Sequence, residues 1–233
     1  MAFGGSGVGN PNDLPAGKSG QDFTICYNGA TMILLIHRSV GRQLLDACSE
    51  LRSNVDDIDI NKAELTTKLG EVRTLPLPVK DTEPEDLIKL VNHLASEHIF
   101  QNYTHVALKS CYSSLSLRAE AVSLNLSTWE AIITRVAEIG LIPIVVTPPP
   151  RRPSTSLAAR HQNDVEFVAQ LVSLAVKHGV PHFDLHGILA DDPGYLKKQY
   201  RRRLPVDGHP NLNGAEVAGK MLARYLSDVL DPA

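Results

Sequence analysis

The sequence predicts a three-layer α/β/α sandwich, with a mostly parallel sheet of about five strands between two layers of helices. Short apolar runs, typical of strands buried on both faces, alternate along the chain with longer segments that repeat apolar residues at helical spacing. This alternation implies βαβ crossovers and therefore parallel strands with helices on both faces. A length of 233 residues with 43% hydrophobic content is enough for one domain with a sizeable core.

The first predicted strand is the continuous apolar run at residues 32–36, and residues 41–51 follow it with apolar side chains at helical spacing. Residues 54–70 are polar and predict no definite element. Residues 71–79 alternate apolar and polar side chains, but two prolines among them favour an edge strand or an extended loop.

A well-marked helix is predicted at residues 83–99, because Thr82 can cap it, Pro84 lies in its first turn and its leucines form one face. Residues 104–108 predict the next strand, which is again short and apolar.

The C-terminal half continues the alternation. Glycines at 140 and 179 mark the ends of two of its helices. The predicted order is a helix, a strand, a long helix, a short strand and a last helix, at residues 126–139, 142–147, 157–178, 182–185 and 213–230.

Composition narrows the class of protein. The formal charge of -3 gives no sign of nucleic-acid binding, and no apolar run is long enough to cross a bilayer. Three widely spaced cysteines show no metal-ligand spacing and imply no disulfide framework, which favours a reduced, cytoplasmic setting without a metal. Residues 1–22 are rich in Gly, Asn, Pro and Ser and lack a signal-peptide pattern, so we expect a flexible leader before a single domain at 23–233. Nothing in the sequence determines the oligomeric state.

Polar residues gather where the predicted strands end, which is where open parallel sheets keep their sites. The first strand runs into His37, Arg38 and Ser39, and the 104–108 strand runs into Lys109-Ser110-Cys111. Ser39 lies on a strand-to-helix turn, where its backbone N–H would face a developing oxyanion at the helix N-terminus. The alternative is that Ser39 only caps that helix, since serine is a preferred cap.

A histidine suited to activate this serine lies near the other end of the chain. His209 and Asp207 share a Gly/Pro-rich loop just before the last predicted helix. A serine hydroxyl needs a base within hydrogen-bond reach, and the base needs a group that orients its ring. The nearby run Arg201–Arg203 is interpreted either as a solvated loop or as a clamp for an anionic ligand.

These two segments resemble the first and last blocks of the SGNH/GDSL hydrolase family. The resemblance covers residues 31 to 233 and is most specific in Asp207-Gly208-His209-Pro210-Asn211; a branch of the family has His-x-Ser-Val-Gly at the first block, as at 37–41. It implies hydrolysis or transfer of an acyl group from a small ester, a lipid or an acetylated sugar, without a metal or other cofactor. Ser39 would be the nucleophile, His209 the base, and Asp207 the residue that orients His209.

The chain departs from the family pattern in three places. The family's acid lies three residues before the histidine, where this chain has Val206, so Asp184 or a backbone carbonyl is an alternative orienting group. No glycine lies between 70 and 140 to supply the second oxyanion donor. Lys109-Ser110-Cys111 stands where the family has Gly-x-Asn. Lys109 or Ser110 can replace the missing donor, unless Lys109 points to solvent and Cys111 is only a core thiol.

These observations leave three hypotheses for the function. The first is an acyl-ester hydrolase or acyltransferase that acts on a small acylated substrate. The second is a non-hydrolytic domain of the same fold, in which His37, Arg38, Lys109 and Cys111 contact an acylated, glycosyl or anionic ligand, or in which the same pocket runs a different reaction. The third is a flavodoxin-like module that binds phosphate at the first helix, although loop 36–41 lacks the repeated glycines usual for such a site.

Overall fold

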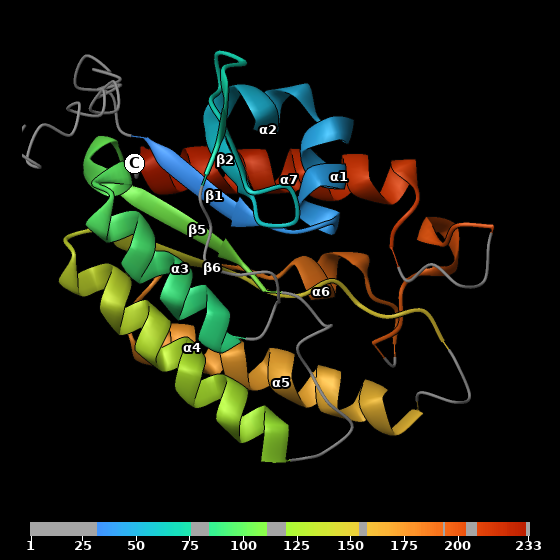
Figure 1. Cartoon of the computed structure of the whole chain (residues 1–233). Coiled ribbons are helices and arrows are strands. Elements are labelled where there is room, and N and C mark those ends of the chain that lie inside the picture. The colour runs from blue at the N-terminus through green and yellow to red at the C-terminus, as the bar shows by residue number, and fades with distance from the viewer. Residues whose placement is uncertain are drawn as a thin grey trace, which may run out of the picture.

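The computed structural model describes residues 32–75, 84–110, 120–153, 158–192, 194–203 and 209–231. Within them a seven-stranded sheet has the order β4-β3-β2-β1-β5-β6-β7. Helices α1, α2 and α7 cover one face of this sheet, and α3, α4 and α5 cover the other (Figure 1). The predicted three-layer α/β/α fold is therefore confirmed.

The strands are β1 (Ile33–His37), β2 (Val55–Asp59), β3 (Glu64–Thr66), β4 (Val72–Thr74), β5 (His105–Lys109), β6 (Ile142–Val146) and β7 (His182–Phe183). The α-helices are α1 (Val40–Ala47), α2 (Ser49–Asn54), α3 (Pro84–Ser96), α4 (Glu120–Glu138), α5 (Ala158–Lys177), α6 (Leu185–Leu189) and α7 (Leu212–Leu230). Short 3₁₀ turns lie at Ile99–Asn102 and Lys198–Tyr200.

The sheet is mixed. The five strands from β2 through β1, β5 and β6 to β7 are parallel, whereas β3 pairs antiparallel with both β2 and β4. The sheet thus has two strands more than the five or so expected. The additional strands β2 and β3 lie in the segment 54–70, whose polar composition predicted no element.

Strand β2 is polar in sequence yet buried in the fold. Asp56, Asp57 and Asp59 are each at most 2% exposed. The Tyr103 hydroxyl donates to Asp56 at 2.8 Å, and the His37 ring bonds to Asp57 at 2.8 Å. A buried carboxylate is tolerated only when it is paired, and these partners allow a strand without the usual apolar pattern.

Alternation along β1 divides the core into two. Leu34 and Ile36 pack with α3, α4 and α5, while Ile33 and Leu35 pack with α1 and α7. The predicted helix at 41–51 is in fact two helices, because Cys48 is extended between α1 and α2. Buried Cys48 lies directly against α7 at Gly219, where an added Cβ would be 2.7 Å from the Cys48 Cβ.

Helices α1 and α7 both begin at the carboxyl edge of the sheet. Helix α1 starts three residues after β1, and α7 runs back along the same face against the direction of the β1 arrow (Figure 1). Close contact at Gly219 holds the two helices together. Residues 38–39 and 209–211, which precede the two helices, therefore lie at the carboxyl edge of the sheet. No helix in the part of the chain that the structure describes is long and apolar enough to cross a bilayer.

Candidate active site

Ser39 lies at the tight turn between β1 and α1, in a backbone conformation that is rare for residues with a side chain. Its φ is 25° and its ψ is -77°. Such conformations cost of order 1–3 kcal/mol and gather at functional sites. Ser39 occupies the N-cap position, but its side chain makes no capping hydrogen bond. The structure therefore does not assign its hydroxyl to helix capping.

His37 lies beneath this turn and faces the interior. Its side chain is fully buried, and Nε2 is 2.8 Å from the Oδ2 of Asp57. Because an ionised carboxylate only accepts, His37 Nε2 carries the proton in this bond. Nδ1 is buried and has no hydrogen-bond partner among the residues that the structure describes. The His37 ring is thus held inside the fold two residues before Ser39, and its neighbour Arg38 is half-buried.

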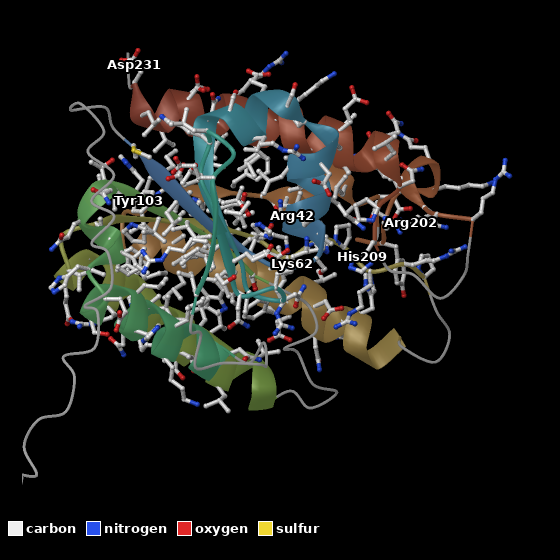
Figure 2. The ribbon with its side chains drawn as sticks, turned by 45° about the horizontal axis from the view of Figure 1, so that its top comes forward. Arg42, Lys62, Tyr103, Arg202, His209 and Asp231 are labelled. Atoms are coloured by element: carbon white, nitrogen blue, oxygen red, sulfur yellow. The ribbon has the colours of Figure 1, made fainter. Side chains whose placement is uncertain are left out.

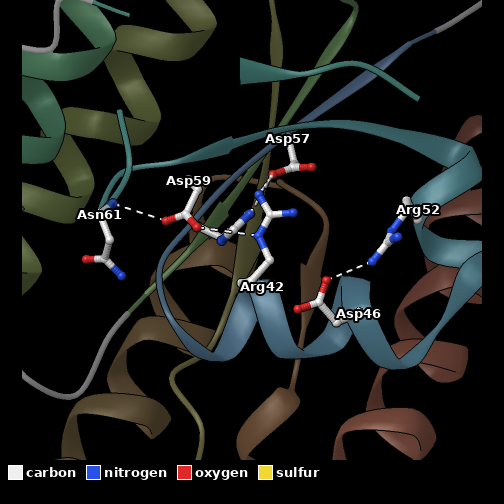
Figure 3. A network of polar contacts seen from close by, with 7 residues as sticks. Arg42, Asp46, Arg52, Asp57, Asp59 and Asn61 are labelled. Carbon is white, nitrogen blue, oxygen red and sulfur yellow. Dashed lines mark hydrogen bonds and ion pairs between the residues drawn. The ribbon is translucent and has the colours of Figure 1, made fainter. Parts of the chain in front are cut away.

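Arg42, in the first turns of α1, reaches down to the same carboxylates. One guanidinium nitrogen is 3.0 Å from Asp57 Oδ2, and Nε is 3.4 Å from Asp59 Oδ2. The backbone N–H of Asn61 donates to the other Asp59 oxygen at 3.1 Å. Figure 3 shows Arg42 between the two aspartates. Sequence reasoning missed this cluster, although three acids within five residues at 55–59 were a visible signal.

Lys109 ends β5 beside the end of β1. Ile36 pairs with Leu108, so the following residues, His37 and Lys109, end neighbouring strands side by side. Lys109 is only 7% exposed, and its ammonium donates to the carbonyl of Ser110 at 3.0 Å. The alternative in which Lys109 points to solvent is therefore wrong. Ser110 is also buried.

The loop that carries His209 is fastened at its base. Asn211 caps α7 by accepting from the Gly214 N–H at 2.9 Å, and its amide donates to the Gln199 carbonyl at 2.7 Å. The Arg202 Nε donates to the Pro210 carbonyl at 3.1 Å. Half-buried His209 and Arg202 lie at one end of the molecule, away from Asp231 at the end of α7 (Figure 2).

Two arginines of the basic run at 201–203 make hydrogen bonds and an ion pair with neighbouring segments of the chain. Arg201 donates to the Leu196 carbonyl at 2.7 Å and pairs with Asp191 at 3.3 Å. These contacts, with that of Arg202, tie the basic run to Asp191, Leu196 and Pro210. They favour neither a purely solvated run nor a dedicated anion clamp.

Asp184, the alternative group for orienting His209, is engaged elsewhere. Its Oδ1 accepts from the Gly187 N–H at 3.0 Å and from the Thr147 hydroxyl at 3.1 Å, so it caps α6 and ties it to the end of β6. The expected catalytic Asp207 and the expected oxyanion residue Cys111 lie outside the described residues. Ser39, Lys109 and His209 all stand at the carboxyl edge of the sheet.

No family model and no curated protein matches this sequence. Solved structures do match. A candidate acylhydrolase from Bacteroides fragilis has a TM-score of 0.62 at 12% identity, covering 88% of this chain and 90% of that chain. A GDSL-like lipase from Bacteroides thetaiotaomicron has a TM-score of 0.60 at 9% identity, and the match covers 85% of this chain and 89% of the lipase. A lipase/acylhydrolase from Enterococcus faecalis has a TM-score of 0.56 at 17% identity, and the match covers 87% of this chain and 99% of that protein.

At these identities the likeness shows the fold. The chain has the α/β architecture found in GDSL and SGNH acylhydrolases, over most of its own length and theirs.

Proposed function

We propose that the protein is a serine hydrolase that cleaves an acyl ester or transfers its acyl group, with Ser39 as nucleophile and His209 as general base. The observation that carries the proposal is Ser39 itself. Its turn is strained, it follows the central strand β1, and its side chain makes no capping hydrogen bond. Strain held at a strand-to-helix turn suits a nucleophile whose hydroxyl must be presented at the sheet edge.

In the proposed reaction, His209 accepts the Ser39 hydroxyl proton as the oxygen attacks the ester carbonyl carbon. The tetrahedral intermediate collapses when His209 returns the proton to the leaving alcohol, which leaves an acyl-serine. Water, or an acceptor alcohol in a transferase, then releases the acyl group by the same steps in reverse. Asp207 is proposed to orient the His209 ring.

Two groups are proposed to stabilise the oxyanion. The first is the Ser39 N–H at the start of α1, where the helix dipole favours negative charge. The second is the Lys109 ammonium, which is buried at the end of the neighbouring strand. A cation in a poorly solvated position stabilises a developing anion much more strongly than it does in water. Lys109 would thus replace the asparagine of the family pattern.

The proposed substrate is a small acylated molecule, such as a simple ester, a lipid or an acetylated sugar. Lipases and acylhydrolases share the fold, which supports this class without choosing among its members. We retain a cytoplasmic setting as part of the proposal; Cys48 is a buried free thiol, which fits a reducing compartment.

The test is covalent labelling with a fluorophosphonate probe, together with hydrolysis of p-nitrophenyl esters of increasing acyl length. We expect labelling of the wild type, none of Ser39→Ala, and a loss of several orders of magnitude in kcat for His209→Ala. Lys109→Met is expected to lower kcat by about 10²–10³-fold, as the loss of one oxyanion donor does. Ser53→Ala, at an exposed serine elsewhere, is the matched control and should label normally.

A folded wild type that neither labels nor turns over any ester would contradict the proposal. It would favour a non-hydrolytic domain that binds an acylated, glycosyl or anionic ligand through Lys109 and Arg38.

A further inference from the structure

We propose that Asp57 is a positioning residue for the Ser39 turn. It holds the chain on both sides of the serine at once, through His37 on β1 and Arg42 on α1. The catalytic consequence of this inference rests on the proposed role of Ser39, whereas the contacts themselves do not.

A single oxygen of Asp57 receives both contacts. Oδ2 lies 2.8 Å from His37 Nε2 and 3.0 Å from a terminal guanidinium nitrogen of Arg42. His37 stands two residues before Ser39, and Arg42 stands three residues after it. The Asp57 carboxylate therefore bridges the two sides of the chain reversal at Ser39, and we call this bridge the closure (Figure 3 shows its Arg42 side).

The closure is anchored to a rigid part of the fold. Asp57 lies in β2, which pairs with β1 over the whole length of both strands. Arg42 is held a second time by Asp59, and Asp59 is itself fixed by the N–H of Asn61. The side chains of both aspartates are 3% exposed, so water does not readily substitute for either. Without Asp57, the His37 ring and the guanidinium would lose a charged acceptor in a place that offers little solvent.

The His37 ring also shapes the start of α1. The position of a Cβ on Gly41 lies 2.3 Å from the His37 Cβ and 2.9 Å from its Nδ1, so the helix rests directly on the ring. The two hydrogen bonds that define the turn run from the Gly41 N–H to the Arg38 carbonyl, at 2.7 Å, and from the Gln43 N–H to the Ser39 carbonyl, at 3.1 Å. A shift of the ring moves the backbone that presents Ser39. Non-glycine residues keep positive φ only where the surroundings force it.

Asp56 supplies a matched control. It is the preceding residue of the same strand and is equally buried, but it faces the opposite side of the sheet. There it accepts from the Tyr103 hydroxyl at 2.8 Å and from the Lys68 N–H at 2.7 Å. Removing its charge tests the loss of a buried carboxylate from β2 without touching the Ser39 turn.

The experiment compares Asp57→Asn with Asp56→Asn in the full-length chain. A displacement of the nucleophile by about 1 Å costs about 10²-fold in rate, so we expect Asp57→Asn to lower kcat and the fluorophosphonate labelling rate by about that factor. We expect KM to change little, because substrate contacts are intact. Asp56→Asn should keep kcat within about 2-fold of the wild type while losing stability. Equal kcat for the wild type and folded Asp57→Asn would overturn the proposal.

Two further arms keep the test decisive. Arg42→Met removes only one flank of the closure from a partly exposed position, so it should fold where Asp57→Asn fails. It is expected to lower kcat by about 10-fold, and an unchanged kcat would count against the proposal. Amide hydrogen exchange of Gly41 and Gln43 reads the turn without any catalysis. Their exchange should accelerate in Asp57→Asn but not in Asp56→Asn.

The exchange readout separates the two proposals. If the wild type has no esterase activity, the proposed function fails, but faster exchange confined to Asp57→Asn still supports the closure. If exchange at Gly41 and Gln43 is the same in both variants, the closure is wrong even for an active enzyme.

Discussion

Gly41 is the position where the geometry of the Ser39 turn makes the sharpest energetic prediction. Gly41 lies in the first turn of α1, and an alanine there would place its Cβ 2.3 Å from the Cβ and 2.5 Å from the Cγ of His37. Real Cβ atoms do not approach other carbons so closely. The His37 ring has no simple escape, because its Nε2 is bonded to buried Asp57.

The magnitude of the effect follows from three contributions. Overpacking a dense interior costs about 1–3 kcal/mol. Forcing the His37 ring off Asp57 gives up a hydrogen bond to a charged group, worth about 1.5–3 kcal/mol. Alanine returns up to about 1 kcal/mol through its better helix propensity. Gly41→Ala is therefore expected to lower the free energy of unfolding by about 1.5–6 kcal/mol.

Urea denaturation measures this loss, and a double-mutant cycle with His37→Gly tests its cause. In the His37→Gly background both clashing carbons are gone. Gly41→Ala should then be neutral, or stabilising by up to about 1 kcal/mol. If Gly41→Ala costs the same with and without the His37 side chain, or costs less than about 0.5 kcal/mol in the wild type, the close approach is not what excludes a side chain at this position.

Three other predictions concern groups away from this turn. Burial lowers the pKa of His186 below its usual 6.5, so the folded state binds fewer protons there and stability is lost as pH falls below that value; His186→Gln should remove this part of the pH dependence of urea unfolding, and an unchanged slope would contradict the assignment. Burial raises the pKa of Asp56, and the Tyr103 hydroxyl opposes that shift; Tyr103→Phe should therefore cost about 1–3 kcal/mol, more at neutral pH than near pH 4, and a cost independent of pH would refute the bond to the charged form. Asn211→Ala should lower stability by about 1 kcal/mol or more, whereas Asn211→Asp keeps the acceptor for the Gly214 N–H and should recover part of that loss in the same unfolding assay; equal losses would mean that the cap contributes nothing.

The parallel strands that could be predicted are those whose burial is written in the chain as an apolar run. Strands β1, β5 and β6 are buried on both faces by helices, so each appears as a short run of aliphatic residues. The same reasoning failed for β2, because its acids are buried by partners as distant in sequence as Tyr103. The 41–51 segment was predicted as one helix, since helical spacing continues across Cys48 where the backbone does not.

Ser39, Lys109 and His209 could be selected from the sequence as candidates, because the ends of parallel strands and the loop before the last helix are known places for polar chemistry. The residues that surround Ser39 in the fold could not be predicted from the sequence. Asp57 lies 20 residues from His37 and 15 from Arg42, and only the pairing of β1 with β2 brings them to one oxygen.

The amino-acid sequence alone thus determined the layers of this protein and the residue types at its sheet edge, since periodicity and strand ends are local properties. The tertiary structure decided that Lys109 is buried, that Asp184 is a helix cap and that His37 bonds to Asp57 beneath the serine turn, since each depends on which distant groups share a desolvated space.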